Sequence, residues 1–87
     1  MRSSTNQPRF FVVHLNERDR PAPDQRFEVQ VLDPHGRTVC CGYFGDVEED
    51  LEVEGRTIPR PVIEAARRQP LGRGDYVDES GYSVPPF

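Results

Sequence analysis

The stretch RFEVQVLDPHGRTVCCGYF, residues 26–44, contains the strongest folding signal in the chain. Its first part alternates apolar and polar side chains, which predicts a strand over 26–33 with one face turned toward a core. The tetrapeptide DPHG at 33–36 has the residues that a type I turn favours, with its glycine in a left-handed conformation. Residues 37–44 return as a second strand, in which Gly42 marks a bulge or a close backbone approach. The stretch therefore predicts an antiparallel hairpin.

Three further segments extend this hairpin into a larger structure. Residues 9–15 are a short apolar run, which predicts a central strand buried on both faces. Residues 51–54 alternate and predict a fourth strand at the sheet edge, where outward charged side chains deter aggregation. Residues 60–69 predict the one helix, because Pro61 is tolerated in a first turn and an apolar stripe follows it. That stripe consists of Val62, Ile63 and Ala66.

Together these segments predict an α+β fold: a three- to four-stranded antiparallel β-meander with one helix of the C-terminal half packed on one face. A small SH3-like barrel plus a helix is the alternative. Residues 74–84 are compatible with a second tight hairpin, because Asp78 and Gly81 repeat the spacing of the first turn. We expect a flexible arm over residues 1–8 and a single domain over residues 9–87.

Length and composition limit the classes of function. The 87 residues are 34% hydrophobic and 30% charged, and no apolar run approaches the ~20 residues of a membrane span. The N-terminal residues lack the apolar stretch of a signal peptide, so we expect a small bacterial protein of the cytoplasm. The core is thin for a stable monomer, and a homodimer would support it. The net charge of −4 argues against nucleic acid as a partner.

The charges are segregated along the chain, and this is the main functional clue in the sequence. Residues 46–54 form an acidic run without any basic residue, and the Arg-rich helix predicted over 60–69 follows it. The acidic run is suited to docking on a basic partner, and the arginines to an anionic one. In a homodimer the acidic run of one subunit would face the Arg-rich helix of the other. The candidate interaction residues are Asp46, Glu48, Glu49, Asp50, Glu52, Glu54, Arg60, Arg67 and Arg68.

The cysteines and histidines do not form a recognisable site. Cys40 and Cys41 are adjacent, so their side chains point to opposite faces of a strand and do not readily bind one ion or each other. His14 and His35 lack the spacing of zinc ligands. His14 would be the base for either thiol in a nucleophilic site, but one buried and one packed cysteine is the simpler interpretation. We therefore expect no catalytic, cofactor or metal site.

These observations predict a non-enzymatic protein-interaction module, which modulates a larger protein or serves as its small subunit, with an inhibitor or immunity protein as one version. Neutralising Glu48, Glu49 and Asp50 is expected to weaken partner binding and leave the fold intact. One alternative is a small ligand-binding or Cys-dependent enzyme-like domain, with a pocket between helix and sheet. The other is nucleic-acid binding through the Arg-rich helix.

Overall fold

The hairpin predicted over residues 26–44 is present in the computed structural model, which describes residues 9–46 and 49–85. Strands β2 (Phe27–Leu32) and β3 (Thr38–Phe44) pair antiparallel, and Gly36 in the turn between them has a φ of 88°. The predicted alternation is confirmed, because Phe27, Val29 and Val31 are buried. The arm expected over residues 1–8 lies outside the described residues.

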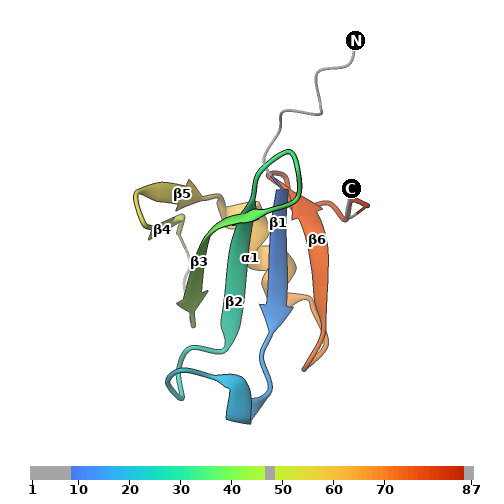
Figure 1. The fold of residues 1–87 in the computed structure, drawn as a ribbon. Coiled ribbons are helices and arrows are strands. Elements are labelled where there is room, and N and C mark those ends of the chain that lie inside the picture. The colour runs from blue at the N-terminus through green and yellow to red at the C-terminus, as the bar shows by residue number, and fades with distance from the viewer. Residues whose placement is uncertain (1–8, 47–48, 86–87) are drawn as a thin grey trace.

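The main sheet has four strands in the order β3-β2-β1-β6, and all neighbours are antiparallel (Figure 1). Strand β1 (Arg9–His14) is central, as predicted, between β2 and β6 (Gly74–Asp78). The predicted burial of both faces is wrong, because Phe10 and Val12 are buried on one face, whereas Phe11 and Val13 on the other face are only half-buried. The turn expected after β6 is also confirmed, because the Gly81 amide donates to the carbonyl oxygen of Asp78 at 2.9 Å.

The fourth strand of the sheet is β6, so the prediction that residues 51–54 form its edge is wrong. Strand β4 (Leu51–Val53) instead pairs with β5 (Arg56–Ile58) in a separate two-stranded sheet. The cause is a two-residue turn in which Glu54 and Gly55 both have positive φ, 50° and 82°, so the chain folds back at once. The α+β class is confirmed. The described residues form a four-stranded sheet, a two-stranded sheet and a helix, in place of the alternative barrel.

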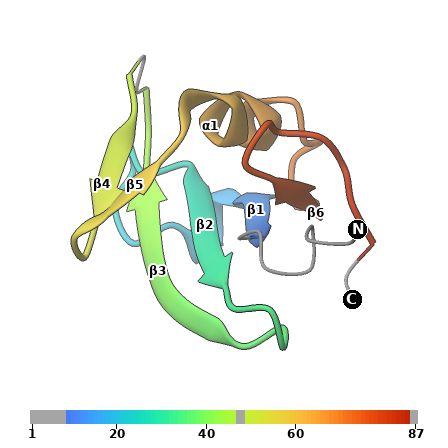
Figure 2. The same ribbon diagram turned by 90° about the horizontal axis from the view of Figure 1, so that it is seen from above.

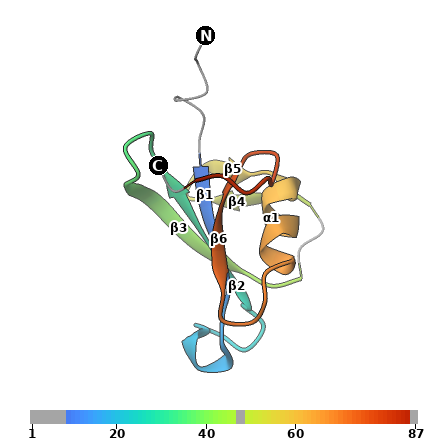
Figure 3. The same ribbon diagram turned by 90° about the vertical axis from the view of Figure 1, so that its right-hand side faces the viewer.

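Helix α1 (Arg60–Arg67) lies over one face of the main sheet, and no described helix covers the opposite face (Figures 2 and 3). It ends two residues before the predicted limit of 69, where Arg68 forms the C-cap and Pro70 follows. The predicted stripe is buried, and Ala65 joins it. These side chains pack into one core with Phe10, Val12, Phe27, Val29, Val31, Cys40, Phe44, Ile58 and Val77.

Strands β4 and β5 join this core through their inward side chains. Leu51 and Val53 pack against it, and Ile58 is fully buried within it. A Cβ atom at Gly42 would lie 2.7 Å from a methyl carbon of Val53, so the close approach predicted at this glycine is confirmed. Its physical cause is the side chain of β4, which occupies the space above β3. The two-stranded sheet is therefore anchored at a defined position.

Candidate functional site

The acidic run maps mainly onto the β4–β5 hairpin, residues 51–58, and the segment leading into it. Side chains alternate along β4, so Leu51 and Val53 face the core while Glu52 is exposed. Glu54 is exposed at the tip of the turn, where a Cβ atom added at Gly55 would meet nothing within 4 Å. The hairpin therefore presents carboxylates outward from a strand pair whose inner side is held in the core.

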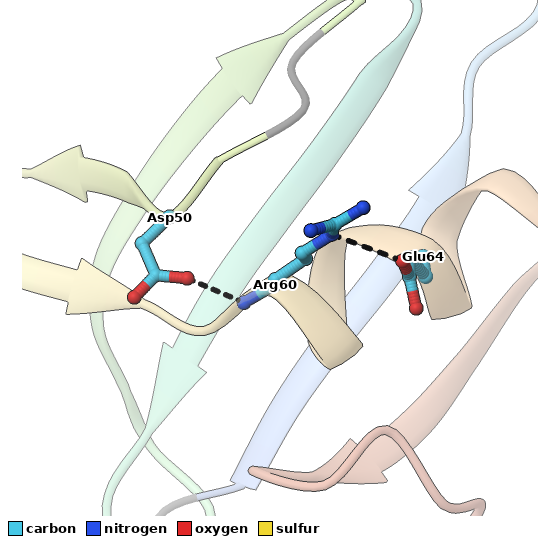
Figure 4. Close-up of polar contacts among 3 residues, drawn as sticks. All are labelled: Asp50, Arg60 and Glu64. Carbon is cyan, nitrogen blue, oxygen red and sulfur yellow. Dashed lines mark hydrogen bonds and ion pairs between the residues drawn. The ribbon is translucent and has the colours of Figure 1, made fainter.

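Asp50 differs from the other members of the run because it contacts the start of helix α1. Its Oδ1 atom accepts a hydrogen bond of 2.9 Å from the backbone N–H of Arg60, and the Arg60 Nε atom lies 3.2 Å from Glu64 Oε2 (Figure 4). The N-cap residue of α1 is Pro59, which makes no side-chain cap. Asp50 thus satisfies one of the free amides of the first turn and places negative charge at the positive end of the helix.

Replacing Asp50 with alanine is expected to lower the free energy of unfolding by about 1 kcal/mol, the usual loss when a helix cap is removed. Asp50→Asn retains an acceptor oxygen and should recover part of that loss. Chemical denaturation measures the difference, with Glu49→Ala as the matched control on an exposed neighbour. Equal stability of the Asp50→Ala and Glu49→Ala variants would contradict a capping role. The sequence-based expectation that neutralising Asp50 leaves the fold unaffected is revised accordingly.

The remaining acidic residues separate into paired and open groups. Asp46 forms an ion pair with Arg26, whose guanidinium also lies 5.7 Å from the centre of the Phe27 ring. Glu48 lies outside the described residues. Glu49, Glu52 and Glu54 are exposed, and Glu52 accepts a hydrogen bond of 3.4 Å from the Thr57 hydroxyl. We refer to Glu52 and Glu54 within the hairpin, together with Glu49 just before it, as the hairpin carboxylates.

The arginines of α1 do not act as one patch. Arg60 is paired with Glu64, and Arg68 donates a hydrogen bond of 3.2 Å to the carbonyl oxygen of Gly81. Arg68 therefore ties the end of the helix to the turn that follows β6. Arg67 is exposed. Because Arg60 and Arg68 are engaged in contacts within the chain, this helix face favours nucleic-acid binding less than the sequence suggested.

The two cysteines lie on opposite faces of β3, as their adjacency predicts. Cys40 is buried in the core, and the Cys41 thiol donates a hydrogen bond of 3.0 Å to Glu28 Oε2 on the outer face. Burial, reinforced by the Glu28 carboxylate, raises the pKa of Cys41 to about 11. Cys41 is therefore a thiol near neutral pH, whereas nucleophilic chemistry needs the thiolate.

His14 is not positioned as a base for either cysteine. Its Nδ1 atom lies 2.9 Å from the Gln69 carbonyl oxygen, and its ring packs 4.9 Å from that of Phe27. His14 follows Phe10 and Val12 in the strand alternation, so it is on the core face, opposite to Cys41. Cys40 shares that face but lies four positions along the register of β2, which corresponds to ~13 Å. This arrangement does not support a Cys–His site.

The raised pKa of Cys41 has a direct consequence for thiol labelling. In a Cys40→Ala background, alkylation of Cys41 by iodoacetamide at pH 8 should be about 100-fold slower than for a thiol with the ordinary pKa of 9.0. Adding Glu28→Gln should accelerate it, because the carboxylate that opposes ionisation is removed. Stability should fall as pH rises from 9 toward 11, because the unfolded state ionises first. An alkylation rate equal to that of the unfolded chain would contradict the contact with Glu28.

The described residues also show where ligands have room. The buried side chains of α1 and the sheet pack into one core between them. Two surface hollows lie elsewhere, one beside the Arg26–Asp46 pair and one beside Arg18 and Leu71. Within residues 9–46 and 49–85, no three His, Cys, Asp or Glu side chains come together as metal ligands.

No family model, curated protein or solved structure matches this chain. The described part of the chain contains no helix long and apolar enough to cross a membrane. The contact of Asp50 with α1 was missed by sequence reasoning, although one signal pointed to it. Residues 59–61 read Pro-Arg-Pro and offer no side-chain oxygen at the N-cap, so the cap had to come from another segment.

Proposed function

We propose that this protein is a small non-enzymatic interaction module that binds a larger protein with a basic surface through the hairpin carboxylates. The observation that carries the proposal is the fixed position of these side chains. Glu52 and Glu54 project from a hairpin whose other side is fixed in the core by Val53 and Ile58. A surface held in place loses little conformational freedom on binding.

The electrostatics of the hairpin favour fast association with such a partner. None of the hairpin carboxylates forms an ion pair with another described residue. Exposed charges of one sign steer an oppositely charged protein and mainly raise the association rate. Arg56, on the same hairpin, is the one basic side chain within it, so the local charge remains negative. The partner is thus identified by its chemistry, a folded protein with clustered Lys or Arg.

The test removes charge without disturbing the anchors. A triple variant with Glu49→Gln, Glu52→Gln and Glu54→Gln should retain its stability and lose most of its capture of the partner from a host lysate. The matched control, Glu17→Gln, Asp19→Asn and Glu79→Gln, changes the net charge equally at exposed positions far along the sequence. It should capture the partner as the natural chain does. Equal capture by the two triple variants would refute the proposal.

A further inference from the structure

The outer edge of β3 is an unpaired strand edge at one end of the main sheet. In antiparallel sheets, successive residues direct their backbone groups alternately to the two sides. The Leu15 amide donates to the Arg26 carbonyl oxygen at 2.8 Å, so Arg26 directs its backbone groups toward β1. Because the direction alternates along β2, Val29 directs its backbone N–H and C=O groups toward β3. Val29 is opposite Gly42 in the register. Cys41 and Tyr43, on either side of that glycine, therefore direct their N–H and C=O groups to the free edge.

The opposite edge of the sheet is covered by the chain itself. The Val84 amide donates to the Tyr76 carbonyl oxygen at 2.9 Å, and Val77 forms a bridge with Ser83. No backbone hydrogen bond from another described segment reaches Cys41 or Tyr43. Among the residues that the structure describes, the two edges of the main sheet therefore differ, because the β3 edge leaves backbone donors and acceptors unpaired.

Strand β3 also has little of the usual protection of a free edge. Its seven residues, Thr38–Phe44, contain no charged side chain. Val39 is 43% exposed and Tyr43 is 41% exposed. Soluble proteins normally keep such edges short, charged, bulged or covered, because an open edge pairs with other strands. Here a bulge at the Thr38 end interrupts the register, and the stretch 40–44 is left regular.

We propose that a second copy of this chain pairs with β3, antiparallel, about a two-fold axis through Gly42. In this register Cys41 faces the partner's Tyr43, and Tyr43 faces the partner's Cys41. Their outward backbone groups then satisfy one another in two hydrogen-bonded pairs. The two Gly42 residues face each other across the axis as a non-hydrogen-bonded pair, where the strands approach most closely, and glycine has no side chain to obstruct that approach. The strand is thus self-complementary, which is what a two-fold interface requires.

The size of this contact predicts its strength. Pairing of one short strand buries less than the ~800 Å² per partner of a standard stable interface. We therefore expect a reversible dimer whose population rises with protein concentration. Glu54 lies close enough to Cys41 to help raise the pKa of its thiol, so the two surfaces are neighbours. The proposal does not rest on the proposed function, because dimer formation and capture of a partner are measured separately.

Sedimentation velocity of the full chain between ~10 μM and ~1 mM tests the dimer. The natural chain should shift from monomer to dimer, and Tyr43→Lys should raise the dissociation constant at least about tenfold, because the charge enters the two-fold contact twice. The control is Tyr82→Lys, at a position that is 72% exposed on the turn after β6. A chain that stays monomeric up to ~1 mM, or a dimer equally insensitive to both variants, would overturn the proposal.

Disulfide trapping tests the register and decides the question should Tyr43→Lys fail to fold. In Tyr43→Cys, the introduced thiol lies opposite Cys41 of the second copy. Both cysteine variants, Tyr43→Cys and the control Tyr82→Cys, carry Glu28→Gln, which removes the carboxylate that opposes ionisation of Cys41. Oxidation with copper phenanthroline and oxygen at pH 9 should yield a covalent dimer, whose peptide map links position 43 to the partner's Cys41. Tyr82→Cys should give no comparable product. Absence of a covalent dimer in Tyr43→Cys, or linkage through other positions, would show that β3 does not pair in this way.

Discussion

Replacing Gly81 with alanine should lower the free energy of unfolding by about 3 kcal/mol, for two separable reasons. Gly81 has a φ of 81°, a left-handed conformation that costs an L-residue roughly 1–2 kcal/mol. In addition, an alanine Cβ would lie 2.4 Å from the Pro61 carbonyl oxygen, so the turn would be forced away from α1. Such overpacking adds about 1–3 kcal/mol. The Arg68 hydrogen bond to Gly81 would be disturbed by the same movement.

Gly55 provides the matched control, because its φ of 82° is nearly identical and its surroundings are open. Gly55→Ala should lose only the backbone cost of about 1 kcal/mol. Urea denaturation of both variants separates the two contributions, and the difference of about 2 kcal/mol reports the contact between the turn and α1. Equal losses at the two glycines would mean that the turn does not press against the helix as described.

The second large effect is expected at Ile58, the residue that fixes the β4–β5 hairpin to the core. Ile58 is fully buried, and truncation of such a side chain to alanine costs about 2–5 kcal/mol, because apolar contacts are lost and a cavity remains. Ile58→Ala should therefore lower the free energy of unfolding by about 3 kcal/mol. Its neighbour Thr57 is exposed on the other side of the strand, and Thr57→Ala should change it by less than about 0.5 kcal/mol.

Loss of the Ile58 anchor should also appear in local dynamics. Amide hydrogen exchange in β4 and β5 should accelerate more than in β1 and β2, because the small sheet pairs with no other strand in the described residues. Exchange that rises equally in all strands would indicate that the hairpin opens only with the whole domain. A loss below about 1 kcal/mol would place Ile58 outside the cooperative core.

Sequence reasoning located the hairpin at 26–44, the central strand and the helix, because each has a local periodic pattern or turn signal. It failed for residues 51–54, where alternation showed a strand but not its partner. The pairing of β4 with β5 depends on the turn at Glu54 and Gly55 and on the space above Gly42. The alternation of apolar and polar residues gives no information on either. The turn predicted after β6 was correct, whereas the pairing of β6 with β1 was, for the same reason, not predicted.

The candidate site was predicted as a charge pattern, and the structure assigns different tasks to its members. Asp50 caps α1, Asp46 pairs with Arg26, and Arg68 holds the final turn. These three contacts join residues 10, 20 and 13 positions apart, respectively, so they depend on tertiary geometry, which a count of charges does not describe. What remains open for a partner is the smaller set of hairpin carboxylates.

The most direct test of the central claim is the association rate of the partner, measured by stopped flow for the natural chain and the two triple variants at low and physiological salt. The natural chain and the control should associate at similar rates, each slowed by added salt. The variant lacking the hairpin carboxylates should associate about tenfold more slowly at low salt and respond little to salt. Equal rates and equal salt dependence in all three proteins would contradict the claim that these carboxylates are the docking surface.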